Sequence, residues 1–287
     1  MALIDLLQTS PSFFIFFCTV IGLAVGSFLN VVIHRLPKML QAEWDQQRAK
    51  LENEAVAALP PHNLVAPRSR CPHCGHTLAA WENIPVASYI MLRGKCSHCR
   101  AAISPRYPAI ELLSGMLSAL VAWHFGYGIA GFAGLFFAWA MVALVFIDID
   151  VQLLPDRITL PLLWAGLLVN LNNVFTDIRS AVIGAVAGYL LLWAIYWCYK
   201  LISGKEGLGR GDFKLLAAIG AWLGWEMLPL VILFSSLTGA MAGIILVLLE
   251  KQERDTPVPF GPYLAGGSFV AFFGGDLINR AYFGMLG

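Results

Sequence analysis

The sequence predicts an all-α polytopic membrane protein with about eight transmembrane helices and a small cytoplasmic insert between the first and second helices. Composition is the first reason: 58% of the 287 residues are hydrophobic and 13% are charged, whereas a soluble domain carries about 25% charged residues. The mean hydropathy is +0.70. The other two reasons are a series of long uncharged stretches and a single sizeable polar region between the first two of them.

The uncharged stretches are long enough for helices that cross a bilayer, which takes roughly 18 residues or more. The first stretch is too long, and is followed by too many others, to be a cleaved signal peptide. Two of the stretches divide into two spans each, one at Gly126-Tyr127-Gly128 and one at Trp225-Glu226 and Pro229, where Glu226 is the one charge inside a stretch; this makes eight spans. The stretches are Pro11–Ile33, Leu112–Ile147, Ile158–Thr176, Ser180–Tyr199, Leu215–Leu249 and Thr256–Gly275.

The distribution of Lys and Arg predicts the orientation of the chain, because cytoplasmic loops carry an excess of these residues. Seventeen of the 19 fall on the side of the polar region, and only Arg179 and Arg280 fall on the other. The N-terminus is therefore expected outside the cytoplasm and the polar region inside it. The net charge is only +1, so no bulk attraction to nucleic acid is expected.

The polar region, residues 35–107, is predicted to bind zinc. Its first part, Gln41–Leu59, is rich in helix formers and free of Gly and Pro, which predicts a short surface helix. Two Cys-x-x-Cys pairs follow, separated by 21 residues, and two such turns together can complete a tetrahedron of thiolates around Zn²⁺. The ligands expected for a structural Zn²⁺ are Cys71, Cys74, Cys96 and Cys99.

The alternatives to zinc are disulfides or redox dithiols. A reducing cytoplasm disfavours structural disulfides, and two matched pairs are unlike a lone redox motif. His73, His76 or His98 could replace one thiolate, although four cysteines are the simpler ligand set. Four thiolates leave no open position on the metal, so no hydrolytic role is expected for it.

Carboxylates that border apolar spans are candidates for a functional site. Asp148 ends the uncharged stretch that begins at Leu112 and therefore lies deepest on the cytoplasmic side. If the helix continues, Asp150 points about 200° away from Asp148, so only one of them can face a given partner. Asp156 follows a proline and precedes an apolar run, which is typical of a helix N-cap.

The remaining candidate is Asp212, which ends a Gly-x-Gly-x-Gly-Asp run at the same face. Paired with Asp148, it would provide the chemistry of aspartic proteases, in which one carboxylate accepts a proton from water and the other protonates the carbonyl. The glycines at 207, 209 and 211 would allow unusual backbone angles and close approach of a substrate main chain. The alternative is a flexible turn whose aspartate caps the next helix or pairs with Arg210 or Lys214; these residues alone leave both open.

Five segments carry a specific resemblance when they are taken together and in this order. They are "GSFLNVVIHRLP" (from Gly26), "RSRCPHCGHTLAAWENIPVASYIMLRGKCSHCRAAISPRYPAIELL" (from Arg68), "DIDVQLLPD" (from Asp148), "EGLGRGDFKLLAAIGAWLG" (from Glu206) and "PFGPYLAGG" (from Pro259). In these segments, over nearly its whole length, the chain resembles the type IV prepilin peptidase family.

The resemblance implies roles for particular residues. Asp148, the first aspartate of the Asp-x-x-x-x-x-x-Pro-Asp segment, and Asp212 would be the catalytic pair, and the four cysteines would match the family's metal site. The chain would then comprise a first transmembrane helix (1–34), a cytoplasmic insert with the four-cysteine zinc site (35–107) and a transmembrane aspartic peptidase core (108–287).

The resemblance also implies an activity in the bacterial inner membrane. Members cut the short basic leader from type IV prepilins and type II secretion pseudopilins after a glycine, at the cytoplasmic face. Many then methylate the new N-terminus with S-adenosylmethionine, and the insert is characteristic of these bifunctional members. No Gly-x-Gly-x-x-Gly motif marks a site for the methyl donor. Glu43, Asp45 and Glu82 are interpreted as solvated surface charges in preference to methyl-transfer residues.

Three alternatives remain at this stage. A monofunctional prepilin peptidase would lack the methyl transfer. A proton-coupled transporter also uses intramembrane carboxylates, but it would place them near the bilayer midplane and show paired broken helices in two halves. A zinc-bearing membrane scaffold would leave the aspartate pair unexplained.

Overall fold

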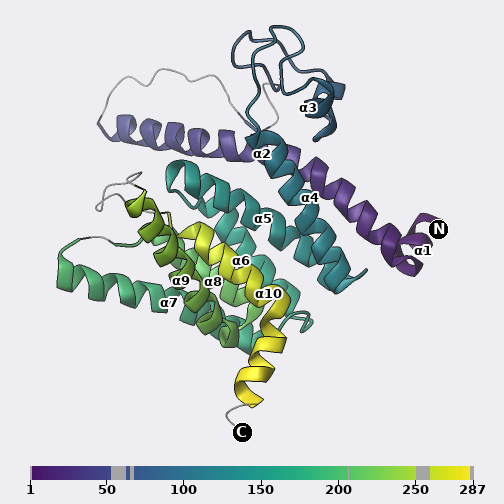
Figure 1. Ribbon diagram of the computed structural model, residues 1–287. Coiled ribbons are helices and arrows are strands. Elements are labelled where there is room, and N and C mark those ends of the chain that lie inside the picture. Colours follow the sequence, from purple (N-terminus) through teal and green to yellow (C-terminus); the bar gives the residue numbers. More distant parts are fainter. Residues whose placement is uncertain (1, 53–62, 65–67, 206, 250–258, 285–287) are drawn as a thin grey trace. The chain divides into compact units, whose positions relative to one another are not determined.

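The computed structural model is helical over most of its length (Figure 1). It describes residues 2–52, 63–64, 68–205, 207–249 and 259–284. Within these residues there is no strand, only isolated bridges between Arg70 and Thr77 and between Lys95 and Ala102. The α-helices are α1 (Ala2–Thr9), α2 (Pro11–Leu51), α3 (Ala87–Met91), α4 (Arg106–Phe125), α5 (Ile129–Val151), α6 (Asp156–Asn170), α7 (Ile178–Ser203), α8 (Arg210–Leu223), α9 (Leu228–Leu248) and α10 (Gly261–Gly284); short 3-10 helices cover Ala80–Asn83 and Trp225–Met227.

Among the described residues, five helices are long and apolar enough to cross a membrane, so the chain is a multi-pass membrane protein. They are α2, α4, α5, α7 and the run Trp225–Leu248, which includes α9. Two of the expected spans are shorter than expected: α6 has 15 residues and α8 has 14, fewer than the roughly 20 that a spanning helix needs. The all-helical class is confirmed in the described part of the chain, where five helices have the length and composition of a span; the expected number of about eight stays a prediction.

The helix α2 continues without a break from the first apolar stretch into the charged segment that follows it. Pro37 lies inside the helix and does not end it. The helix predicted over Gln41–Leu59 is confirmed as far as residue 51, but it is the continuation of α2 and not an element of its own, because nothing between the two segments stops the helix; residues 53–59 lie outside the described residues. The expected border at residues 34 and 35 falls within α2.

The chain forms two compact units, unit 1 (Met1–Ala143) and unit 2 (Leu144–Gly287). In unit 1, α2 packs closely against α4. Small residues allow this approach: a Cβ added at Gly26 would lie 2.7 Å from the Cα of Glu111, and one added at Gly22 would collide with the side chain of Ser118. Glycine and serine are the residues that permit such close helix contacts in membranes.

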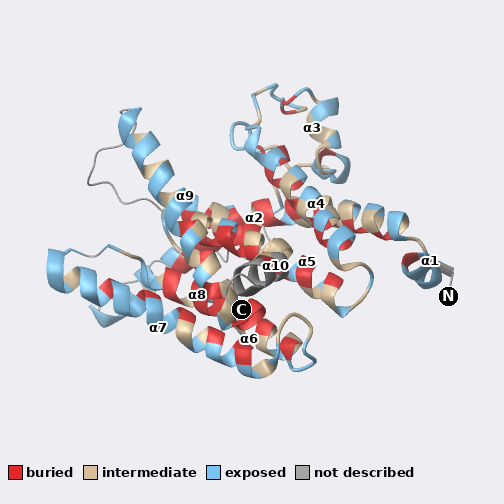
Figure 2. Cartoon of the chain, turned by 60° about the horizontal axis from the view of Figure 1, so that its bottom comes forward, coloured by how far each residue is buried: buried red, intermediate tan, exposed pale blue. Residues whose placement is uncertain are grey.

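The core of unit 2 is the short helix α8, which Figure 2 shows as almost wholly buried. Eleven of its 14 residues are buried, and a helix that is apolar all round belongs in the interior of a bundle. It packs against α6, α7 and α10. On α7 all the buried residues except Ala181 recur every four positions and form one stripe along the helix: Ser180, Gly184, Gly188, Leu192 and Tyr196.

The helices α7 and α8 cross at two glycines. A Cβ added at Gly184 would collide with the backbone carbonyl of Gly220, and one added at Gly188 would lie 2.6 Å from the carbonyl oxygen of Leu216. Since a backbone carbonyl cannot move aside as a side chain can, any larger residue at Gly184 must separate the two helices.

We therefore expect Gly184→Val to lower the stability of the protein by roughly 1–3 kcal/mol, measured as a lower thermal unfolding temperature in detergent micelles. Val186→Leu is the control, because Val186 lies on the same helix and is 54% exposed. Equal unfolding temperatures for the two variants would contradict this account of the crossing.

Candidate active site and metal centre

Asp148 lies in the last turn of α5 and is held by a backbone donor from the far end of the chain. Its side chain is buried, whereas Asp150, two residues on, is exposed. The N–H of Gly261, the first residue of α10, donates a hydrogen bond of 3.0 Å to Asp148 Oδ2. A Cβ at residue 261 would lie 2.7 Å from that oxygen. Only glycine at this position lets the backbone reach the carboxylate.

Asp212 is the third residue of α8 and is also buried. Its Oδ2 accepts a hydrogen bond of 3.1 Å from the N–H of Gly209, the residue just before the helix. Asp148 lies close enough for its charge to act on Asp212. The structure thus places two buried carboxylates of unit 2, one from α5 and one from α8, close enough for the charge of Asp148 to act on Asp212.

The buried side chain of Leu154 connects the segments around the two aspartates. It follows α5, and its Cβ lies 2.8 Å from where a Cβ at Gly211 would be. Its Cδ2 lies 3.3 Å from the corresponding position at Gly261. The beginnings of α8 and α10 therefore meet at Leu154.

Asp212 caps α8, as one interpretation of the sequence expected, and it also lies near Asp148; its catalytic role stays a prediction. The expected pairing with Lys214 is wrong. The Nζ atom of Lys214 lies 2.6 and 2.7 Å from the two carboxylate oxygens of Asp156. Asp156 is also not an N-cap: Pro155 occupies that position, and Asp156 is the first residue of α6. The ion pair joins the beginnings of α6 and α8.

The glycines before Asp212 have a different role from the one expected. Gly209 has an ordinary φ of −74°, and Gly211 lies inside α8, so neither adopts the unusual backbone angles that the sequence suggested. Close approach is observed, but to the protein's own side chains: Gly211 to Leu154, as described above, and Gly207 to Tyr199, whose ring lies 2.7 Å from an added Cβ.

The four predicted cysteines converge in unit 1, and all of them are free thiols. Their Sγ atoms lie within 4.8 Å of one another, and those of Cys71 and Cys99 are 3.8 Å apart. A tetrahedral Zn²⁺ with Zn–S bonds of about 2.3 Å implies Sγ–Sγ distances of about 3.8 Å. The residues present therefore fit a tetrahedral metal ion such as zinc, and no histidine belongs to the cluster.

The cluster is built from two turns of matching geometry. The N–H of Cys71 donates to the carbonyl of His76 and the N–H of Cys96 to that of Ala101, at 2.8 Å in each case. Backbone N–H groups of Cys74 and His73 direct hydrogen bonds at Cys71 Sγ and lower its pKa to about 7. A depressed thiol pKa favours the thiolate, which is the form that binds metal.

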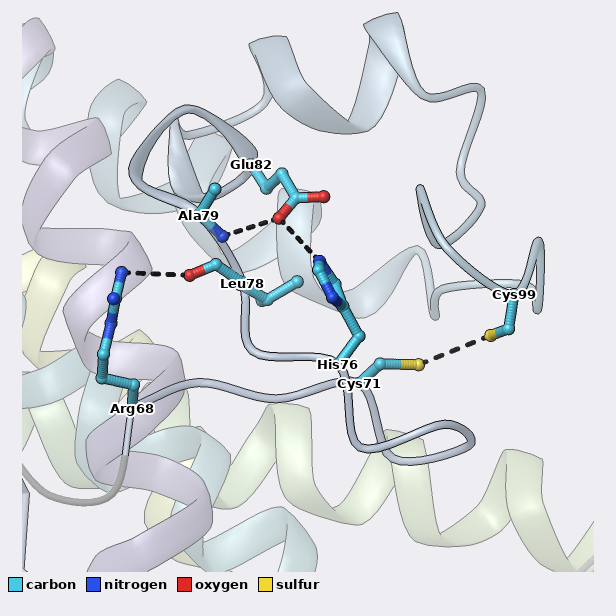
Figure 3. A network of polar contacts seen from close by, with 7 residues as sticks. All are labelled: Arg68, Cys71, His76, Leu78, Ala79, Glu82 and Cys99. Atoms are coloured by element: carbon cyan, nitrogen blue, oxygen red, sulfur yellow. Dashed lines mark hydrogen bonds and ion pairs between the residues drawn. The ribbon is translucent and has the colours of Figure 1, made fainter.

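Glu82 connects the two cysteine turns and is not the solvated surface charge that the sequence suggested. It is only 7% exposed. Figure 3 shows its Oε2 accepting from the N–H of Ala79 at 2.6 Å and facing Nε2 of His76 at 3.3 Å. Hydrogen bonds from the Ser97 hydroxyl, in the second turn, and from the Ala79 N–H hold the pKa of Glu82 below its usual value. One carboxylate thus binds groups beside both turns.

Comparison with known proteins shows the family to which the chain belongs. The Bacterial Peptidase A24 N-terminal domain matches residues 20–125, and the Type IV leader peptidase family matches residues 135–244. The Prepilin leader peptidase/N-methyltransferase of Stutzerimonas stutzeri is 52% identical over 280 residues, 97% of each chain. The chain belongs to the type IV leader peptidase family. Proteins of the same printed name from Pseudomonas aeruginosa (51% identical, 98% of each chain) and Aeromonas hydrophila (52% identical, 98% of this chain and 97% of the relative) are equally similar. No solved structure matches the chain significantly.

The two matched regions of this type IV leader peptidase family member hold different chemistry. The N-terminal region contains the cysteine cluster, and the peptidase region contains Asp148 and Asp212. Membership of a peptidase family excludes the two other functions considered above, a proton-coupled transporter and a zinc-bearing membrane scaffold without catalysis. Gly261 was not predicted as a partner of Asp148, although the residue stands between Phe260 and Pro262 in a segment that carried the resemblance.

Proposed function

We propose that the chain is a membrane aspartic endopeptidase and N-methyltransferase. It cuts the short basic leader from type IV prepilins and type II secretion pseudopilins after a glycine, and it then methylates the new N-terminus. The observation that carries the proposal is the pair of buried carboxylates, Asp148 and Asp212, each oriented by the N–H of a glycine. Relatives that share about half of the sequence are named for both activities.

In the cleavage step one of the two carboxylates accepts a proton from a water molecule, which attacks the scissile carbonyl carbon. The other, protonated, carboxylate donates its proton to the carbonyl oxygen. The first carboxylate then passes the proton it took from water to the leaving amine as the carbon–nitrogen bond breaks, and the second recovers its proton from a hydroxyl of the tetrahedral intermediate. Two buried carboxylates that lie near one another favour one acting as base and the other as acid, because it is unfavourable for both to be ionised at the same time. The hydrogen bonds from Gly209 and Gly261 fix the direction in which each carboxylate points.

The membrane topology is part of the proposal. We place the N-terminus in the periplasm and the aspartates at the cytoplasmic face of the bacterial inner membrane, in a peptidase core over residues 108–287 of a fold with about eight spans. The excess of Lys and Arg on one side of the chain supports this orientation. A substrate that is itself a membrane helix can then present its leader junction at the membrane boundary.

The proposed cofactors are Zn²⁺ and S-adenosylmethionine. Cys71, Cys74, Cys96 and Cys99 would hold the Zn²⁺, whose four bonds to thiolates would join the two cysteine turns and leave no position for a reacting group. S-adenosylmethionine supplies an electrophilic methyl group to the freed amine.

The proposal is tested by mass spectrometry of a prepilin incubated with the purified protein and S-adenosylmethionine. We expect a product that lacks the leader and carries one added methyl group. A shortened product without the methyl group would favour the monofunctional peptidase. An intact prepilin under these conditions would contradict the function.

Gly261 provides a test of how Asp148 is positioned. We expect Gly261→Ala to lower the rate of leader cleavage about 100-fold, because the new methyl group displaces the Asp148 carboxylate and small misplacements of a catalytic group have effects of this size. Gly266→Ala is the matched control, since Gly266 lies on the same helix with no atom within 4 Å of an added Cβ. Equal cleavage by the two variants would show that Gly261 does not position Asp148.

A further inference from the structure

Glu111 is a buried carboxylate of unit 1 that the proposed cleavage chemistry does not use. It lies in the second turn of α4 and is 8% exposed. Because α4 is one of the helices long and apolar enough to cross a membrane, an ionisable side chain here is unfavourable unless it has a partner or a function. Its surroundings therefore indicate what it binds.

The partners of Glu111 are neutral. The N–H of Val86 donates to Oε2 at 2.8 Å, and the side chain of Ser27 on α2 lies near enough to act on the carboxylate. Within the part of the chain that the structure describes, no Lys, Arg or His pairs with Glu111. The groups in the described residues that act on the Glu111 carboxylate are the Val86 N–H and the Ser27 side chain, and neither of them is titratable. The carboxylate has a donor that orients it but no cation that neutralises it.

Val86 is held in an unusual conformation where it meets Glu111. Its φ is 59° and its ψ is −46°, and the N–H of Ala87 bonds to the carbonyl of Pro85, which together form a strained γ-turn. A β-branched residue at positive φ is a genuine outlier. Such strain persists where the surroundings impose it and is concentrated at functional sites.

A second polar group at the same place lacks a partner. Ser114 lies three residues after Glu111 and hence on the same face of α4. Its Oγ is fully buried and, among the described residues, has no hydrogen-bond partner. Both residues border Gly26 of α2: a Cβ there would lie 2.7 Å from Glu111 Cα and 3.0 Å from Ser114 Oγ. A buried hydroxyl without a partner and a carboxylate without a cation together suit a ligand that is cationic and donates hydrogen bonds.

We propose that Glu111 and Ser114 bind the newly exposed α-ammonium group of the cut substrate, and that Glu111 is the base for its N-methylation. The proposal rests on the function proposed above. At neutral pH an α-amino group is largely protonated, with a pKa of about 7.7–8.0, and it has no free electron pair to accept a methyl group.

The step balances as follows. The Glu111 carboxylate takes one proton from the α-ammonium, which becomes an amine. The nitrogen electron pair forms a bond to the methyl carbon of a sulfonium donor, and the carbon–sulfur bond breaks with its electrons remaining on sulfur. The product is an N-methylammonium and a neutral thioether. Glu111 then releases its proton to water.

The decisive variant is Glu111→Gln, because the amide oxygen still accepts from Val86 while the negative charge is lost. The substrate is a synthetic peptide with the mature, unmethylated pilin N-terminus, in detergent with S-adenosylmethionine. At neutral pH we expect methylation to fall about 100-fold, with leader cleavage and zinc content unchanged. As the pH rises above the pKa of the peptide amine, the defect should shrink, because the solution then supplies the free amine.

Controls separate this role from a structural one. Asp45→Asn, a change at an exposed carboxylate of the same unit, should methylate normally. Ser114→Ala removes only a hydroxyl without a partner, and we expect the KM for the peptide to rise roughly tenfold. A Glu111→Gln defect that is absent or independent of pH, or an unchanged KM in Ser114→Ala, would overturn the proposal. If the unaltered protein cleaves a prepilin but never methylates the peptide, the methyltransferase function itself is wrong.

Discussion

Replacing either aspartate by asparagine is expected to abolish leader cleavage, with a loss of about 10³–10⁴-fold in rate. Asparagine has nearly the same shape as aspartate, and its side-chain oxygen can still accept from Gly209 in Asp212→Asn or from Gly261 in Asp148→Asn. The fold is therefore retained, and only the ability to accept and donate a proton is lost. The rate is measured by mass spectrometry of a purified prepilin in detergent.

The control for the aspartate variants is Asp150→Asn, because Asp150 is exposed and lies only two residues from Asp148. We expect near-normal cleavage by this variant. Methylation of a pre-cut peptide should be retained in Asp148→Asn and Asp212→Asn, which shows that each variant is folded. Cleavage within tenfold of normal by Asp212→Asn would mean that Asp212 only caps α8.

Loss of metal is expected to have the second large effect. Cys71→Ser removes one of four thiolates that surround the proposed Zn²⁺. Since the two cysteine turns are short and are joined only through the short helices Ala80–Asn83 and α3, binding of the metal contributes directly to the folding of this segment, as in other small structural zinc sites. We expect the variant to lose its zinc and the segment from residue 68 to 105 to become sensitive to protease.

The zinc content is measured by elemental analysis of the purified protein, and protection by limited proteolysis. Cys198→Ser is the control, because Cys198 is an exposed thiol on α7, outside the cluster. It should keep its zinc. A protein that binds no metal and still protects residues 68–105 from protease would refute the proposed site.

Prediction from the sequence was most successful where the physical constraint is local. Two Cys-x-x-Cys turns can each hold a metal ion by themselves, so the convergence of four cysteines was predictable from spacing alone. Asp148 could be preferred to Asp150 because the two side chains point to different sides of one helix, and the structure buries the first and exposes the second.

Prediction was less successful where local patterns allow several partners. Asp156 stands in a sequence typical of an N-cap, yet it pairs with Lys214, 58 residues further along the chain. Glu82 was interpreted as a surface charge because it lies in a polar segment, and its burial follows from contacts with both cysteine turns. The number of spans stays a prediction, because hydropathy does not separate a short, largely buried helix such as α8 from one that crosses the membrane.

Composition, charge asymmetry and motif spacing were thus sufficient for a helical membrane protein with a four-cysteine cluster and two candidate aspartates. The donor that orients Asp148 comes from Gly261, 113 residues away, and the contacts of Glu111 join α2, α4 and the segment around Val86. Such contacts depend on how closely the helices approach one another. That approach is a property of many packed residues together, so no single segment of sequence contains it.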